Sequence, residues 1–166
     1  MSKFITFKPI GEILQEAALI TSPQLEVALR DQTYYEDMRL GEILALRGWI
    51  EQDTADFFAQ EWFKLINRRI DRPIGFYLNK AGLISEEDIK NILREQHLNS
   101  LRFGDTAIKK GLIKPKTINF FLKNLFPSQL DIQQANKRKK AKDIDKITSE
   151  DITYWAIMSS AKLTRP

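Results

Sequence analysis

The stretch MRLGEILALRGWIEQDTADFFAQEW, residues 38–62, decides the fold. It is the clearest of four similar segments. Each begins at a glycine, with a small residue seven positions later and an isoleucine two positions after that. The glycines that open the segments are 29 to 34 residues apart: Gly11, Gly41, Gly75 and Gly104. Self-similarity at such a spacing predicts one supersecondary unit that is used four times.

Each segment has the pattern of a short helix, a tight turn and a longer helix. Gly48 and Gly82 stand where a residue in the left-handed conformation ends the short helix, with apolar residues directly after it. Ser85 is the expected N-cap of the longer helix in the third copy, and Thr21 or Ser22 takes that place in the first. One hairpin cannot bury its apolar face alone, so neighbouring hairpins must pack together.

The copies also alternate in their ends. Odd copies begin Pro-Ile-Gly and end in glutamine, whereas even copies have an arginine two residues before the glycine. We therefore expect an all-α protein of four tandem helix-turn-helix hairpin repeats arranged as two pairs, plus a C-terminal helix over residues 150–162. The expected parts are a first repeat pair, a linker or helix extension, a second repeat pair, and a polar basic linker with the C-terminal helix, at residues 1–62, 63–71, 72–126 and 127–166.

The composition excludes several classes of protein. The 166-residue chain has no cysteine, which rules out disulfides and thiolate metal sites and suits a reducing compartment. No apolar run approaches the length of a membrane span, so we expect a cytoplasmic protein without a membrane span. Most of the net charge of +4 lies in residues 127–166, which hold eight Lys/Arg, five Asp/Glu and the run KRKKAK at 137–142.

Catalytic motifs are missing as well. There is no glycine-rich loop ending in Gly-Lys-Ser/Thr, as a P-loop ATPase would need. His97 is the single histidine, and no base, nucleophile and orienting group can be assembled from the pattern. Glu86, Glu87 and Asp88 match the positive end of a helix rather than a catalytic pair. We therefore expect no enzyme, no catalytic residue, no cofactor and no metal site.

A basic residue, an apolar residue and a glycine recur at helix starts, most clearly at Arg39 and Arg102. A guanidinium there can hold a phosphate or a guanine edge by two hydrogen bonds. The glycine permits close approach of the backbone, and the aliphatic residues that follow offer a wall for a base. These features complement a nucleotide. The alternative interpretation is that the glycines let helices pack closely while the arginines stay solvated.

The pattern RLGEILALRGWI at residues 39–50, with KPIGEILQEAALITSPQLEVALRDQ at residues 8–32, resembles the MshEN family. That family is the N-terminal domain of type II secretion and type IV pilus assembly ATPases. The resemblance covers residues 1–126 and implies a domain that binds cyclic di-GMP between two tandem motifs, largely by apolar contact. The binding residues it implies are Lys8, Ile10, Gly11, Leu14, Leu25, Leu29, Gln32, Arg39, Leu40, Gly41 and Leu44, with a turn at 59–62 closing the second motif.

The chain departs from the family motif in both pairs. Pro9 stands at an arginine position, with Lys8 before it, and Trp62 replaces a closing glutamine. In the second pair, Pro73 replaces the arginine and Leu125 the glutamine. These departures leave open which pair binds the ligand, or whether both do. Further contacts in the second pair are expected from Arg72, Gly75, Arg102 and Gly104.

The favoured interpretation is a free-standing cytoplasmic cyclic di-GMP receptor. It would signal through an unidentified protein partner, such as a transcription regulator or a pilus or secretion component. An alternative is a secretion- or pilus-type interaction adaptor that binds no ligand. A weaker alternative is a nucleic-acid-associated regulator that uses the basic run at 137–142. Direct nucleic-acid binding is not expected, because a solvated basic linker is the commoner meaning of such a run.

Overall fold

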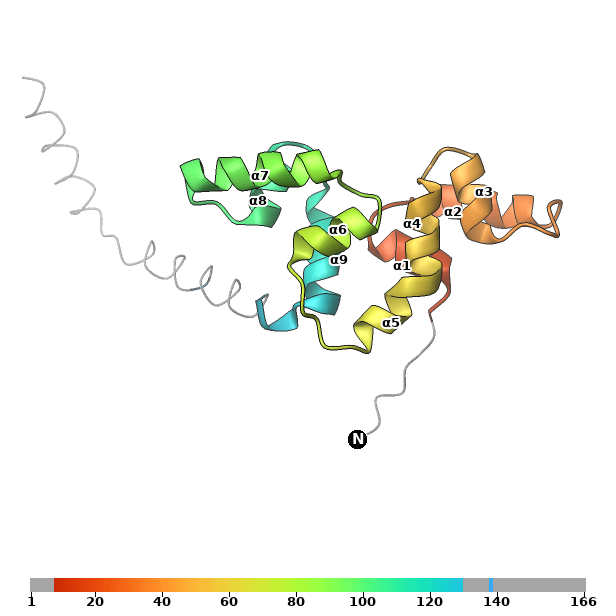
Figure 1. The fold of residues 1–166 in the computed structure, drawn as a ribbon. Helices are drawn as coiled ribbons and strands as arrows, with labels where there is room; N and C mark the ends of the chain where they lie inside the picture. The colour runs from red at the N-terminus through yellow and green to blue at the C-terminus, as the bar shows by residue number, and fades with distance from the viewer. Residues whose placement is uncertain (1–7, 130–137, 139–166) are drawn as a thin grey trace, which may run out of the picture. The chain divides into compact units, whose positions relative to one another are not determined.

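A computed structural model describes residues 8–129 and residue 138. The chain divides into two compact units, Met1–Phe126 and Pro127–Pro166, and the helices named below all lie in the first. Over the described residues the secondary structure is helical, without a strand, which confirms the predicted all-α class (Figure 1). The helix expected over 150–162 lies outside the described residues, as does the basic run at 137–142 apart from Arg138.

Short and longer helices alternate along the first unit. The short helices are α1 (Ile10–Glu16), α3 (Leu40–Leu46), α6 (Ile74–Lys80) and α8 (Phe103–Lys109). The longer ones are α2 (Ser22–Gln32), α7 (Glu86–Asn99), α9 (Pro115–Leu125) and a composite helix of α4 (Gln52–Asp56), η1 (Phe57–Glu61) and α5 (Trp62–Ile66). We call residues 8–66, with α1 to α5, the first half, and residues 67–126, with α6 to α9, the second half.

Every short helix ends at a residue in the left-handed conformation. The φ angle is 57° at Ala18, 68° at Gly48 and Gly82, and 70° at Gly111. At Gly48 the turn is a Schellman motif, because the next amide donates to the Leu44 carbonyl at 3.1 Å and the Gly48 amide to the Ala45 carbonyl at 2.8 Å. The predicted left-handed positions of Gly48 and Gly82 are therefore confirmed.

Side-chain caps fix the starts of two longer helices. The Thr21 hydroxyl accepts from the Gln24 amide at 3.4 Å, and the Gln24 side chain accepts from the Thr21 amide at 2.8 Å. Ser85 and Asp88 form the same reciprocal pair, at 3.1 and 2.9 Å. Hydrogen bonds from the Ser85 hydroxyl and amide hold the pKa of Asp88 below its ordinary value. Thr21, rather than Ser22, is thus the cap of α2.

The segment expected to form a turn at 59–62 is helical instead, so that prediction was wrong. The chain runs from α4 through the π-helical η1 directly into α5. A π-helical turn places one extra residue in the coil and rotates the side chains that follow it. Trp62, which stands where the family motif has glutamine, is buried here, so it belongs to the core rather than to a turn.

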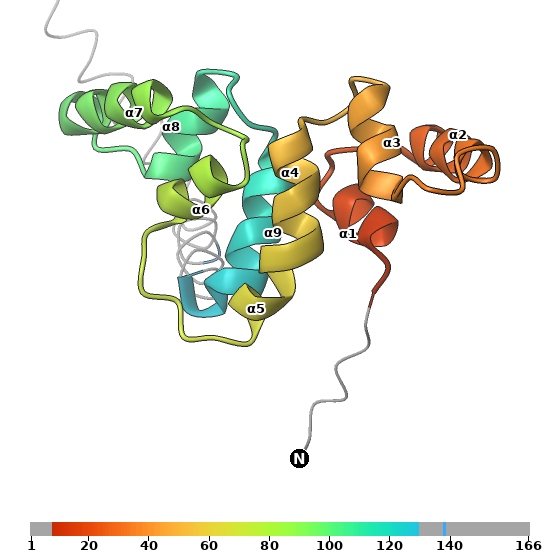
Figure 2. The same cartoon turned by 45° about the vertical axis from the view of Figure 1, so that its right-hand side comes forward.

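An aromatic cluster joins the two halves. It consists of Phe57, Phe58, Trp62, Phe120 and Phe121, all buried. The Trp62 ring stacks on Phe120 with centroids 4.9 Å apart. Two more pairs of rings meet across the halves: the ring centroids of Phe57 and Phe121 are 6.4 Å apart, and those of Phe58 and Phe120 are 6.3 Å apart. Aromatic pairs at such distances are worth about 0.5–1.5 kcal/mol beyond their burial. Helices α5 and α9 lie side by side as a result (Figure 2).

Two buried threonines also tie the halves together. Thr54 of α4 donates to the Ala81 carbonyl at the end of α6, at 2.8 Å. Thr117 of α9 donates to the Ala17 carbonyl at the end of α1, also at 2.8 Å. The last carbonyls of a helix lack partners within it, so each threonine satisfies a buried helix end in the other half.

Candidate functional site

Several of the expected binding residues meet around a small hollow at the start of α3. Its volume is about 250 Å³, and it brings Ile10 of α1 beside the start of α3 and one side of the composite helix. Ile10, Arg39, Leu40 and Gly41 belong to the expected set, and Ala59 lies in the 59–62 segment assigned to the second motif, whereas the other residues of the composite helix were not expected. The full lining is Ile10, Arg39, Leu40, Gly41, Glu42, Gln52, Ala55, Asp56, Ala59 and Phe63.

Arg39 is the one cationic side chain in this lining. Its backbone amide donates to the Glu42 carboxylate at 2.7 Å, which fixes the start of α3. Its guanidinium is exposed and makes no hydrogen bond or ion pair within residues 8–129. A guanidinium that is not held by the protein can bind an anion through two parallel hydrogen bonds. Arg39 is therefore placed to hold an anionic group at the mouth of the hollow.

The structure uses other expected binding residues internally. Leu14 and Leu44 are fully buried, so they support the helices and do not face a ligand. Lys8 forms an ion pair with Glu16. Gln32 donates to the Met38 carbonyl at 3.3 Å, which ties the end of α2 to the loop before α3. Thus the first motif contributes Ile10 to the lining of the hollow, whereas its polar residues Lys8 and Gln32 form local contacts.

Gln96 repeats the role of Gln32 in the second half, donating to the Leu101 carbonyl at 2.9 Å. In the odd segments, the closing glutamine therefore links the end of a longer helix to the loop before the next short helix by a hydrogen bond. Leu25 and Leu29, also in the expected set, lie along α2. Leu25 is half-buried, whereas Leu29 is 47% exposed and does not line the hollow.

The four glycines that open the segments lie at close helix contacts. A Cβ added at Gly11 would come within 2.6 Å of the Leu25 side chain, and one at Gly41 within 3.0 Å of the Ala55 Cβ. Gly75 and Gly104 are equally crowded, at 2.8 and 3.0 Å from a neighbouring side chain. Carbon atoms at optimal contact are about 3.5–4.0 Å apart. The glycines therefore allow packing, as the alternative interpretation of the sequence held.

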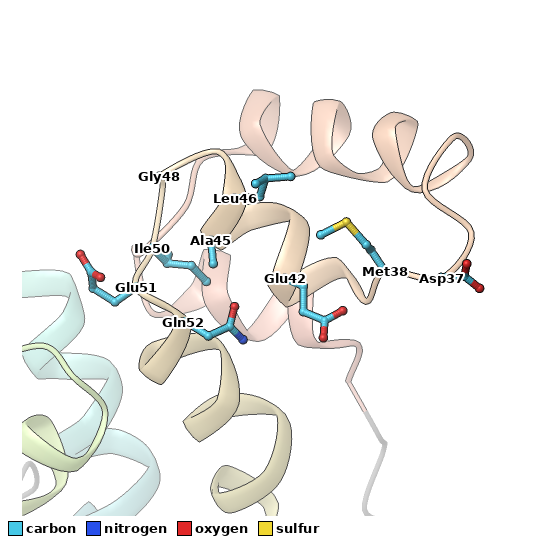
Figure 3. Close-up of a pocket in the computed structure, with 9 residues that line it drawn as sticks. All are labelled: Asp37, Met38, Glu42, Ala45, Leu46, Gly48, Ile50, Glu51 and Gln52. Carbon is cyan, nitrogen blue, oxygen red and sulfur yellow. The ribbon is translucent and has the colours of Figure 1, made fainter.

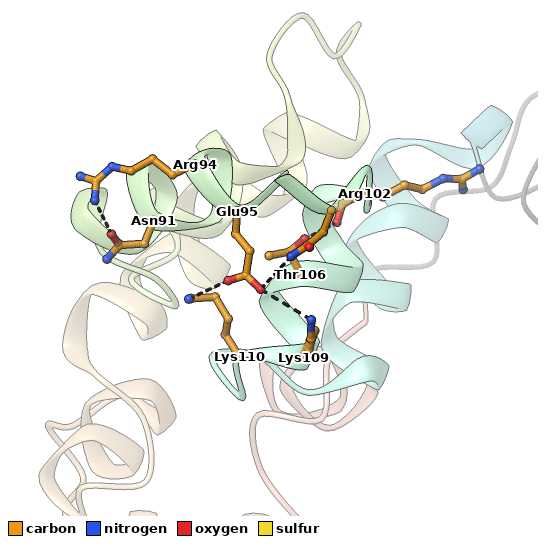
Figure 4. A network of polar contacts seen from close by, with 8 residues as sticks. Asn91, Arg94, Glu95, Arg102, Thr106, Lys109 and Lys110 are labelled. Atoms are coloured by element: carbon orange, nitrogen blue, oxygen red, sulfur yellow. Dashed lines mark hydrogen bonds and ion pairs between the residues drawn. The ribbon is translucent and has the colours of Figure 1, made fainter. Parts of the chain in front are cut away.

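The expected residues of the second half are not drawn into one site by any contact among the described residues. Arg72 lies over the Phe76 ring, 5.7 Å from its centroid, as a cation–π pair. The Arg102 carbonyl accepts from the Thr106 hydroxyl at 3.1 Å, and the Arg102 guanidinium forms no ion pair within residues 8–129 (Figure 4). Nearby, Glu95 pairs with Lys110 at 2.9 Å, and this hydrogen bond lowers the pKa of Glu95.

A larger, shallow groove lies beside the hollow and shares Glu42 and Gln52 with it (Figure 3). It has a volume of about 730 Å³, with Met38, Ala45, Leu46 and Ile50 among its apolar lining. Its charged residues are the carboxylates of Asp37, Glu42 and Glu51, without a lysine or arginine in the lining. Carboxylates repel phosphates, so this groove does not suit an anionic nucleotide.

Charge is divided unequally between the halves. Residues 8–66 hold five Lys/Arg and eleven Asp/Glu, a net charge of −6, whereas residues 67–126 hold twelve and six, a net charge of +6. Glu42 and Asp56 accompany Arg39 in the lining of the hollow. An anion there is therefore attracted by one guanidinium against an acidic background, which favours a ligand bound mainly by apolar contact.

Sequence reasoning missed Ala55 and Phe63, and reached Ala59 only as part of the 59–62 segment; all three line the hollow from the composite helix. The sequence does contain a signal for this hollow. In each segment two apolar residues stand four positions apart, and they are small in the second segment (Ala55 and Ala59) but large in the fourth (Ile118 and Leu122). Small side chains on one helix leave space that larger ones would fill.

Among the described residues, no group of three or more metal-binding side chains lies close enough to hold a metal ion. The search of that same part of the chain found no helix long and apolar enough to cross a membrane.

Comparison with known proteins gives one informative match. No family model matches the chain, and no solved structure matches it. The chain is 48% identical over 120 residues to an uncharacterized protein of Picosynechococcus sp. strain PCC 7002. The match covers 70% of this chain and 63% of that protein, so this chain spans less than two-thirds of its relative's length. The relative's name states neither a ligand nor an activity.

Proposed function

We propose that this chain binds cyclic di-GMP at the hollow beside Arg39 and acts in the cytoplasm through contact with a protein partner. The observation that carries the proposal is a partly apolar hollow lined by an exposed guanidinium that has no partner among the described residues, at the position where the resemblance to the MshEN family expects ligand contacts. Ile10, Leu40 and Phe63 supply the apolar surface. The ligand is a receptor's signal and not a substrate, so the proposal includes no reaction.

The size of the hollow defines how such a ligand would bind. Pockets that enclose a whole small molecule usually measure about 300–1,000 Å³, and this hollow is smaller, at about 250 Å³. It would therefore take one guanine, with the rest of the ligand lying outside. A phosphate or the guanine edge would then meet the guanidinium of Arg39 at the mouth.

Isothermal titration calorimetry tests the proposal with cyclic di-GMP, GMP and GTP as separate ligands. Cyclic di-GMP should bind and the mononucleotides should bind far more weakly. Arg30→Ala is the matched control for Arg39→Ala, because Arg30 is another exposed arginine of the first half and lies outside the lining of the hollow. The proposal fails if cyclic di-GMP gives no binding heat, or if both arginine variants bind it as the wild type does.

We also infer that the four short-and-longer helix pairs are copies of one unit, arranged as two pairs of hairpins. Equivalent positions make equivalent contacts, which supports this inference. Thr54 and Thr117 both follow an opening glycine by thirteen residues, and both donate to the carbonyl six residues after an opening glycine of the other half. The ion pair between Asp31 and Arg47 in the first half has a counterpart between Glu95 and Lys110 in the second half, and the paired residues stand at the same positions relative to the opening glycines.

The second candidate is an interaction module that binds no nucleotide. Specific observations favour it: the acidic first half, the carboxylates in both the hollow and the groove, and large apolar side chains left in water. Tyr34 is 79% exposed and Leu46 is 67% exposed. Exposed apolar surface with a polar rim is one mark of a protein–protein contact. A flat titration with cyclic di-GMP, together with a partner complex weakened by Leu46→Asp, would select this candidate.

A further inference from the structure

The hollow has an equivalent place in the second half, counted from the opening glycines Gly41 and Gly104. Three of the apolar residues there are larger, whereas the counterparts of Ile10 and Phe63 are the same residue types, Ile74 and Phe126. Phe103 is at the position equivalent to Leu40, and the two alanines of the composite helix are replaced by branched residues. The replacements of Ala55 and Ala59 are Ile118 and Leu122.

The larger residues occupy the space that the first half leaves open. Leu122 is 7% exposed, whereas its counterpart Ala59 is exposed and lines the hollow. Ile118 and its counterpart Ala55 are both buried, so there the difference is one of side-chain size. The Phe103 ring fits so closely against Gly75 that an added Cβ would lie 2.8 Å from it. Ile118 is as close to Gly104, at 3.0 Å, as Ala55 is to Gly41, so the clearest contrast between the halves is at Ala59 and Leu122.

We propose that only the first half carries an open ligand site, and that Phe103, Ile118 and Leu122 fill the equivalent place in the second half. The identity of the ligand rests on the function proposed above, whereas the contrast between an open and a filled place rests on geometry alone. Arg102 is exposed at the start of α8, as Arg39 is at the start of α3. Beside it, Phe103 takes the position that Leu40 has beside Arg39.

Two consequences follow. Each chain should bind one ligand, and the small size of Ala59 should be what keeps the site open. Ala59→Leu places in the first half the residue found at the equivalent position of the second half, so it should close the hollow. Gln60→Leu is the matched control, because it adds the same side chain at the next exposed position, which is outside the lining.

Thiol labelling tests the geometry without depending on the ligand. The chain has no cysteine, so a single introduced cysteine reports on its own position. Full-length Ala59→Cys and Leu122→Cys are each treated with iodoacetamide, a neutral reagent, and alkylation is followed by mass spectrometry. Thermal melts confirm that both variants are folded. Cys at 59 should react as fast as in the denatured chain, and Cys at 122 at least about tenfold more slowly, because it reacts only when the structure opens.

Calorimetry with cyclic di-GMP then adds the ligand. The expected results are one ligand per chain, loss of binding in Ala59→Leu, and unchanged binding in Gln60→Leu. If the wild type does not bind cyclic di-GMP, the proposed function fails while the alkylation contrast still supports the open and filled places. Equal alkylation rates at the two positions would overturn the inference, and so would two ligands per chain.

Discussion

The two buried threonines give the sharpest prediction about stability. Thr54→Val and Thr117→Val each keep the shape of the side chain and remove the hydroxyl that reaches a helix end in the other half. Both threonines are 2% exposed, and both hydrogen bonds measure 2.8 Å. Water cannot replace a donor at such a buried place. Each substitution therefore leaves one carbonyl, of Ala81 or Ala17, without its partner.

The expected size follows from that loss. A buried acceptor left unsatisfied costs about 1–3 kcal/mol. For a chain of this length, each kcal/mol lowers the melting temperature by about 2–4 °C, so each variant should melt roughly 2–12 °C below the wild type. Because the two hydrogen bonds are equivalent, the two losses should be similar.

Thermal and urea unfolding, followed by circular dichroism, measure the effect. Thr33→Val is the control, because the Thr33 hydroxyl donates to the Arg30 carbonyl at 2.7 Å but lies at the surface, where water takes over. That variant should change the free energy of unfolding by less than about 0.5 kcal/mol. If Thr54→Val and Thr117→Val cost no more than Thr33→Val, the reasoning about the helix ends is wrong.

Three further predictions concern a turn, the ligand and pH. Gly48→Ala should lower the free energy of unfolding by about 1 kcal/mol through left-handed strain, because no atom lies within 4 Å of the added Cβ; urea unfolding checks this, and an unchanged midpoint refutes it. Arg39→Ala should weaken cyclic di-GMP binding by about one to two decades, the value of a charged hydrogen bond of about 1.5–3 kcal/mol, whereas Arg102→Ala should leave calorimetric affinity unchanged; equal losses would implicate both halves. Lys110 holds the pKa of Glu95 in the folded protein below its ordinary value. The ionised carboxylate therefore contributes fully to stability at pH values above the ordinary pKa, and the contribution is lost as the pH falls through the lowered pKa of the folded state. Glu95→Gln should flatten this part of the curve of urea midpoint against pH, and an unaltered curve would contradict the assignment.

Local signals in the sequence predicted the helix boundaries well. Gly48 and Gly82 mark left-handed helix ends because glycine, which has no Cβ, adopts a positive φ without strain. Ser85 marks a helix start because its hydroxyl can accept from an amide in the first turn. Pro115 marks another, since proline fits the first position of a helix. Each of these signals acts within a few residues, so a sequence is enough to detect it.

Long-range packing was not predictable in the same way. A period of three to four residues says that one side of a helix is buried but not against which partner. The pattern alone therefore gave no reason to place Trp62 against Phe120, or Thr117 at the end of α1. The π-helical η1 was not predicted either, because such turns are rare single-turn features inside α-helices and the helical pattern continues through them.

The candidate site shows the same division. Arg39, Leu40 and Gly41 were expected together because they are adjacent in sequence. Ile10 was also expected, through the resemblance to a family motif, and the fold brings it from α1 to the same hollow, together with Ala55 and Phe63 of the composite helix, which were not expected. Leu14 and Leu44 were expected to contact the ligand, but they are fully buried, because the apolar stripe of so short a helix is needed for the core.

The most direct test of the central claim is amide chemical-shift mapping by NMR on the full-length chain titrated with cyclic di-GMP. The account predicts that the largest changes fall on Ile10, on Arg39 to Glu42, and on Ala59 and Phe63, which surround the hollow. The equivalent positions Phe103, Ile118 and Leu122 should change little. Spectra that do not change with saturating cyclic di-GMP, or changes centred on those second-half residues, would contradict the claim.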